Sequence, residues 1–132
     1  MALDASIIGR SYPAPTAFEV TDAGVRAFVE STGGGYDGGS APATFPIVAA
    51  FDAMMGFLEA EGVELSRVIH GEQRFSYERP VAVGDVLSVA LTVATLRQIG
   101  GNDIVGTTSA VTDQTGALVC TGAATLVHRG EP

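Results

Sequence analysis

Two histidines are the side chains in this sequence best suited to acid–base chemistry, and they lie far apart along the chain. His70 falls in a strand-like segment, whereas His128 lies near the C-terminus, where we expect a surface residue. One cysteine, Cys120, cannot form an internal disulfide or a thiolate metal site, and we expect it to be a small buried residue. With so few nitrogen and sulfur ligands, the sequence predicts no metal site and implies no cofactor.

The orientation of His70 decides whether it can act on a ligand. Strict alternation along the segment places His70 on the polar, outer face with Glu72 and Arg74. A catalytic role would therefore require a β-bulge at Gly71 that turns the imidazole inward.

Two carboxylates stand in unusual surroundings. Asp37 lies in a glycine-rich loop, where an aspartate usually serves turn formation. Asp52 lies within an apolar helix, where a lone carboxylate is costly unless it is hydrogen-bonded or faces a partner. The sequence therefore assigns no catalytic residue to this chain, and His70 and Asp37 remain as candidates.

The elements that must position these residues change character at mid-chain. The pattern predicts a short strand at Phe18–Val20, then a helix at Asp22–Ser31 capped by Thr21. Residues 33–40 contain five glycines and predict a mobile loop or a site of close approach. A second helix is expected from Phe45 to Glu59, and its apolar residues on nearly every face are typical of a buried helix.

The second half alternates with the period of β-strands. Strands are predicted at Ile69–Arg79, Val86–Arg97, Ile104–Thr112 and Leu118–His128. Turn signals separate them, among them Gly100-Gly101-Asn102 and Asp113–Gly116. Three long meander strands and an edge strand after one buried helix predict an α+β domain that spans residues 1–132.

Composition narrows the possible partners. The formal net charge is −8, and no basic stripe is present, so nucleic acid is not an expected partner. The longest apolar stretch is short and interrupted by Asp52, which argues against a membrane span. The N-terminal residues lack the pattern of a signal peptide, so we expect a cytoplasmic location.

Three segments resemble a known family. Residues 69–75 (IHGEQRF) with 79–85 (RPVAVGD) are similar to the strand–turn signature of MaoC-like dehydratase N-terminal domains. Residues 41–45 (APATF) resemble the start of that family's central helix, and residues 8–12 (IGRSY) resemble its opening. The resemblance implies a single hot-dog fold, in which an antiparallel sheet wraps around a long central helix.

The resemblance also implies a reaction shared between two halves. In this family one hot-dog half carries an Asp and a His in a motif of the type Asp-x-Asn-Pro-x-His. This pair hydrates a trans-2-enoyl thioester reversibly to a (3R)-hydroxyacyl thioester, while a second half helps to house the acyl chain. The present loop has Asp37 but neither the Asn-Pro pair nor the His, so the chain resembles the non-catalytic subunit of bacterial heterodimeric dehydratases.

The expected partners are an acyl-coenzyme A or acyl-carrier-protein thioester and a catalytic hot-dog chain, or a second copy of this chain. The start of the central helix is the expected binding region, because unpaired N–H groups near Thr44 and Phe45 could face a polar group of the ligand. The predicted substrate-binding residues lie there and along the helix: Ala43, Thr44, Phe45, Met54 and Met55. Two alternatives remain at this point, a hot-dog thioesterase using Asp37 or Asp52, and a non-catalytic acyl-binding or scaffold module.

Overall fold

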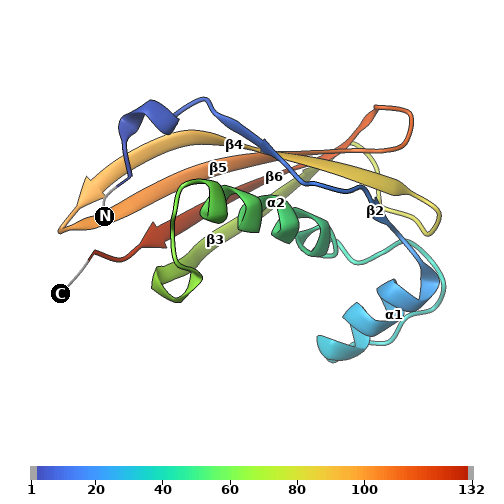
Figure 1. Cartoon of the computed structure of the whole chain (residues 1–132). Coiled ribbons are helices and arrows are strands. Elements are labelled where there is room, and N and C mark those ends of the chain that lie inside the picture. Colours follow the sequence, from blue (N-terminus) through green and yellow to red (C-terminus); the bar gives the residue numbers. More distant parts are fainter. Residues whose placement is uncertain (1–2, 131–132) are drawn as a thin grey trace.

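The computed structural model describes residues 3–130. Two helices and six strands follow one another (Figure 1), and all of them except the short strand β1 were expected from the sequence in this order. The elements are η1 (Ala5–Ile7), β1 (Ser11–Pro13), β2 (Phe18–Glu19), α1 (Asp22–Ser31), α2 (Ile47–Ala60), η2 (Leu65–Arg67), β3 (Val68–Tyr77), β4 (Val86–Ile99), β5 (Asn102–Thr112) and β6 (Leu118–His128).

The sheet is antiparallel, with the strand order β1-β4-β5-β6-β3, and β2 pairs with β4. This confirms the predicted meander of three long strands with β3 as an edge strand. The β4–β5 turn places Gly100 and Gly101 at φ values of 59° and 82°, a left-handed conformation that a two-residue hairpin requires and glycine adopts without strain. Strand β3 pairs only with β6, so its other edge is unpaired in the described chain.

Arg79 joins the turn between β3 and β4 to the turn between β5 and β6. Its guanidinium donates to both carboxylate oxygens of Asp85, at 2.8 and 3.0 Å, and to Asp113 at 3.0 Å. These bonds hold the pKa of Asp85 below its ordinary value. The Arg-Pro and Gly-Asp residues of the strand–turn signature therefore have a structural role here, since they fix the turn between β3 and β4.

Helix α2 lies against one face of the curved sheet, and the core forms between them (Figure 1). Ala53 and Phe57 face this core and are almost completely buried. The outward side of the same helix is open, because Phe51 is 45% exposed and Asp52 is also exposed. The prediction that α2 is buried therefore holds for only one side of the helix.

Helix α2 begins at Ile47, two residues later than the sequence predicted. Residues 43–46 form tight turns in which Phe45 N–H donates to the carbonyl of Pro42, and Ile47 N–H donates to that of Thr44. These donors are already satisfied, so the expected N–H groups near Thr44 and Phe45 are not all available to a ligand.

Helix α1 has the predicted boundaries, and the Thr21 side chain accepts a bond from Gly24 N–H. The glycine-rich loop that follows is held against this helix, because the Arg26 guanidinium lies 5.1 Å from the centroid of the Tyr36 ring. The Tyr36 hydroxyl in turn donates to the Gly39 carbonyl.

His128 corrects a prediction. It is 8% exposed rather than a surface residue, and its Nδ1 lies 3.2 Å from the carboxylate of Asp103. The carboxylate also accepts bonds from Leu3 N–H and from the Gln98 side chain. The position of His128 near the end of the chain suggested that it would be exposed. Strand β6 continues through His128, however, and the side chain faces the covered side of the sheet.

No helix between residues 3 and 130 is long and apolar enough to cross a membrane.

Candidate functional site

A β-bulge at Gly71 determines the direction of His70. On β3, His70 pairs with Leu126 and Glu72 pairs with Thr125, so Gly71 has no Cα partner on β6. The extra residue shifts the alternation by one position and brings His70 to the side of the sheet that faces α2. Strict alternation, which placed His70 on the outer face, is therefore wrong at this position. Ile69 takes the outer face instead and is 50% exposed.

The inward turn of His70 creates a groove at the unpaired edge of β3, which we call the His70 groove. It has a volume of about 390 Å³ and lies between the start of α2 and the strand. Its lining residues are Thr44, Ile47, His70, Gly71, Glu72, Gln73 and Phe75. The groove thus joins one of the predicted substrate-binding residues, Thr44, to the predicted catalytic candidate, His70.

A narrow cavity continues inward from the groove, between α2 and the sheet. Ile47, His70 and Gln73 line both spaces, and Met54 lines the inner one together with the buried hydroxyl-bearing residues Thr107 and Ser109. The inner cavity measures only about 20 Å³, which is room for about one water molecule. An acyl chain therefore does not fit beneath α2 in this conformation, and the open volume is at the edge of β3.

One hydrogen bond organises the polar part of the groove. The Nε2 atom of His70 lies 2.9 Å from the Oε1 atom of Gln73, whose amide nitrogen points to the Arg74 carbonyl at 3.3 Å. With the amide in this orientation, Nε2 is the donor, and Nδ1 of a neutral imidazole remains an acceptor. Gln73 was not predicted from the sequence, because only the bulge shows that it shares a face with His70.

The groove lacks a second acid–base group that contacts His70. The carboxylate of Glu72 lies at the rim, where it pairs with the Arg74 guanidinium. Among residues 3–130, no carboxylate is bonded to His70. The groove can therefore hold an apolar chain and hydrogen-bond a polar group, but it does not contain the paired acid and base that hydration of a double bond requires.

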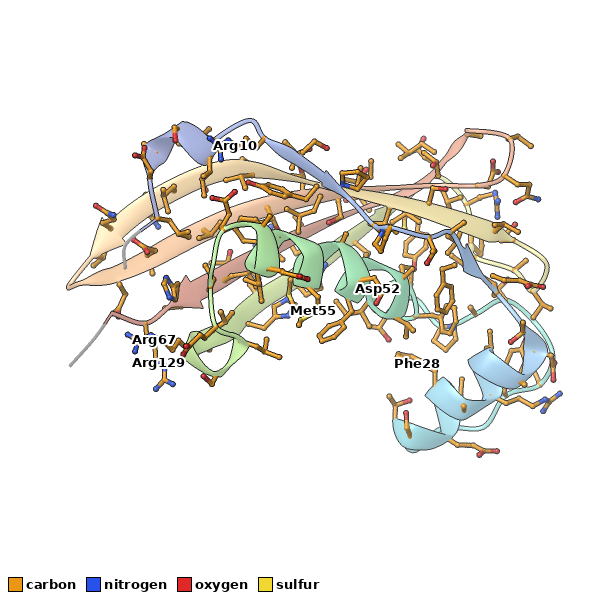
Figure 2. The ribbon with its side chains drawn as sticks, in the orientation of Figure 1. Arg10, Phe28, Asp52, Met55, Arg67 and Arg129 are labelled. Carbon is orange, nitrogen blue, oxygen red and sulfur yellow. The ribbon has the colours of Figure 1, made fainter. Side chains whose placement is uncertain are left out.

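The other predicted substrate-binding residues are dispersed. Ala43 lines a separate hollow of about 450 Å³, where the Tyr77 hydroxyl donates to the Ala43 carbonyl. Burial raises the pKa of Tyr77 to about 12, so this phenol stays neutral. Phe45 is 1% exposed in the core and contacts Phe18 and Phe28 edge to face. Met55 lies about one turn from Asp52 on α2 and is partly buried against the core (Figure 2).

The side chains of Asp37, Asp52 and Cys120 do not line the His70 groove. Asp37 accepts a bond from Gly39 N–H at 2.9 Å, which is turn chemistry within its own loop. Asp52 projects from α2 toward solvent (Figure 2). Cys120 is fully buried as predicted, and burial raises the pKa of its thiol to about 11, which suppresses the nucleophilic thiolate. Within the described part of the chain, no three His, Cys, Asp or Glu side chains gather into a metal-binding group.

The chain is similar to proteins of known sequence and structure. Residues 32–122 match the family model described as FAS1-like, dehydratase domain region. A UPF0336 protein from Streptomyces griseus is 38% identical over 145 residues, which cover 98% of this chain and 97% of the relative.

Solved structures show the same fold. A chain of the C-terminally truncated HadBC complex of Mycobacterium tuberculosis, a (3R)-hydroxyacyl-ACP dehydratase, is 27% identical with a TM-score of 0.83. The match covers 95% of the present chain and 99% of that chain. A MaoC-like dehydratase, 24% identical with a TM-score of 0.80, shares the fold over 95% of this chain and 43% of its own. The fold is therefore the hot-dog fold of dehydratases.

Proposed function

The chain belongs to the FAS1-like dehydratase region family, and on this premise we propose that it is one subunit of a (3R)-hydroxyacyl-thioester dehydratase. In the reverse direction the enzyme hydrates an enoyl thioester. This chain houses the acyl group, and a second hot-dog chain supplies the catalytic Asp and His. The similarity to a chain of the HadBC complex supports a partner subunit, because that dehydratase is itself a complex.

The observation that carries the proposal is the incomplete chemistry of the His70 groove. Hydration adds a hydroxyl group to C3 and a proton to C2 of the enoyl group, so one group must take a proton from water and another must deliver one to C2. The groove offers a single imidazole bonded to a neutral amide. A partner that brings a carboxylate and an imidazole to the open side of the groove would complete this set.

The surface around the groove supports a protein partner. The edge of β3 carries unpaired backbone groups, which proteins usually cover or pair. Phe51, on the adjacent outward side of α2, is 45% exposed and also lines the inner cavity. A second hot-dog chain that extends the sheet across β3 and places its helix beside α2 would cover both features and close the groove.

The geometry gives less support to a thioesterase. That reaction needs a carboxylate near the start of the central helix. Asp37 is engaged in its own loop, and Asp52 projects toward solvent and lines neither the His70 groove nor the inner cavity.

Reconstitution tests the proposal. The full chain would be purified alone and together with a hot-dog chain that carries the Asp-x-Asn-Pro-x-His motif, and hydration of crotonyl thioesters would be followed by the loss of enoyl absorbance. We expect activity from the pair and only background from this chain alone. Hydration by this chain alone would contradict the proposal. A stable pair that binds acyl thioesters but shows only background rates would instead support the acyl-binding module.

A further inference from the structure

The arginines of this chain divide into two groups by their partners. The sequence contains seven arginines and no lysine. Four of the arginines form ion pairs with carboxylates: Arg10, Arg26, Arg74 and Arg79. Among residues 3–130, Arg67, Arg97 and Arg129 have no carboxylate partner, and two of these three lie together.

Arg67 and Arg129 are held next to each other by backbone carbonyls. The Nε and Nη2 atoms of Arg67 donate to the Arg129 carbonyl at 3.2 and 2.8 Å. Arg129 Nη2 donates to the Ser66 carbonyl at 2.9 Å. Figure 2 shows both side chains at the same end of the sheet, where β3 begins and β6 ends. Each guanidinium keeps further N–H donors beyond these bonds.

A hollow of about 510 Å³ lies at this position, which we call the arginine hollow. Its lining residues among residues 3–130 are Arg67, Ile69, Asn102, Val127, Arg129 and Gly130, and none of these six is acidic. The Oδ1 atom of Asn102 accepts from Gly130 N–H at 3.0 Å, so the amide NH₂ group of Asn102 remains as a neutral donor. The hollow thus combines two cations and an amide donor with the apolar side chains of Ile69 and Val127.

We propose that the arginine hollow binds a phosphate group. Two neighbouring guanidinium groups repel each other, and an oxyanion between them would relieve that repulsion. Guanidinium donors match the oxygens of phosphate in geometry and charge. The protein as a whole has a net charge of −8, which disfavours anions, so binding at this place would depend on the local pair and not on the overall field.

The identity of the molecule that carries the phosphate group is inferred from the proposed function. Coenzyme A and the prosthetic arm of an acyl carrier protein both place phosphate beyond the pantetheine that carries the thioester. Ile69 and His70 are consecutive residues of β3 before the bulge, so ordinary alternation places their side chains on opposite faces of the sheet. The arginine hollow is therefore distinct from the His70 groove but lies beside the same end of the edge strand.

Titration with inorganic phosphate and pyrophosphate tests the site in the full chain, with the arginine side-chain N–H resonances as the signal. We expect saturable binding that weakens at least tenfold in Arg67→Gln and in Arg129→Gln. The matched control is Arg97→Gln, which removes an exposed arginine of β4 that also has no carboxylate partner in residues 3–130. Equal affinity in all variants, or an equal loss in Arg97→Gln, would overturn the proposal.

Further arms of the titration identify the carrier. Tighter binding of adenosine 3′,5′-bisphosphate than of inorganic phosphate supports coenzyme A, and tighter binding of 4′-phosphopantetheine supports the carrier-protein arm. Arginine-dependent binding of an apo carrier protein, without any binding of phosphate, would overturn the proposal in favour of a protein-docking surface.

Glu131 lies outside the described residues, so Glu131→Gln is included, and we expect phosphate binding to be retained or strengthened. Phosphate binding needs neither a partner nor turnover, so an inactive reconstituted pair would contradict the proposed function and leave this result standing.

Discussion

Thr44 and Ala43 are adjacent residues that line different hollows, and this separates two possible paths for the acyl chain. Thr44 lines the His70 groove, whereas Ala43 lines the hollow beside Tyr77. Both side chains are exposed, so a larger residue at either position should leave the fold intact.

We expect Thr44→Trp to raise KM severalfold for long acyl thioesters in the assembled enzyme and to change KM little for crotonyl thioesters. Ala43→Trp is the matched control and should leave this chain-length profile close to that of the wild type. The measurement is kcat/KM across a series of acyl lengths. The reverse outcome, with Ala43→Trp selective and Thr44→Trp neutral, would move the acyl site to the hollow beside Tyr77.

Asp103 and His128 form a buried pair that should make stability depend on pH. Burial acts to raise the pKa of Asp103, but hydrogen bonds from Leu3 N–H, Gln98 and His128 outweigh it and hold the pKa below its ordinary value of 3.8. A carboxyl group with a lowered folded pKa stabilises the fold above that ordinary value, and this contribution is lost as the pH falls through the folded pKa.

We expect Asp103→Asn to lower the free energy of unfolding at pH 7 by about 1–3 kcal/mol, because a buried charged acceptor with several donors is removed. The difference between the variant and the wild type should shrink as the pH falls below about 4. Denaturant unfolding across a pH series measures both effects. A difference that stays constant down to pH 2 would show that the charge of Asp103 does not contribute.

At the scale of elements, most strands and helices could be predicted from local sequence patterns. The capped helix α1, the meander of β4, β5 and β6, and the Gly100–Gly101 hairpin each carry a local signal, namely a capping residue, an alternation of period two, or glycines at turn positions. The start of α2 was less predictable, because the turns of residues 43–46 and the helix share the same apolar composition.

The candidate site was harder to predict than the fold because it depends on register. Gly71 alone does not specify a bulge, since glycine occurs in regular strands as well, and the pairing of β3 with β6 decides the matter. Once the bulge forms, His70 and Gln73 share a face, and Thr107 and Ser109 approach from β5, distant in sequence. The burial of His128 likewise depends on the extent of the sheet, which its position in the sequence does not reveal.

The outward side of α2 provides a test of association. Phe51 and Ile99 are both large apolar residues that are about half exposed, but Phe51 lies beside the His70 groove and Ile99 lies at the β4–β5 turn. We expect Phe51→Glu to weaken association with the catalytic partner, or with a second copy, by at least tenfold in Kd, because the charge would have to be buried. Ile99→Glu should leave association unchanged.

Sedimentation of both variants at micromolar concentration measures this effect, and circular dichroism confirms that each is folded. Equal affinity of the Phe51→Glu variant and the wild type would place the interface elsewhere.

At the scale of the whole molecule, the chain has the fold of a dehydratase half with an open groove and one imidazole. The unpaired edge of β3, the exposed Phe51 and the His70 groove lie on one region of the surface, so one partner could cover all three. Arg79 and its partners Asp85 and Asp113 lie in turns outside this region and stabilise the fold itself. This separation of structural and binding features agrees with a subunit that houses an acyl group for chemistry performed by another chain.

The most direct test of this account is the hydration rate of the reconstituted pair after the histidine of each chain is removed in turn. If the partner supplies the chemistry, replacing its motif histidine by alanine should lower kcat by about 10²–10⁴-fold, the usual contribution of a general acid–base group. His70→Ala in this chain should mainly raise KM and leave kcat within about tenfold of the wild type, because His70 contacts the bound group without transferring its proton. A loss of kcat from His70→Ala as large as that from the partner's histidine, in a folded and assembled pair, would contradict the account and place the catalytic base on β3 of this chain.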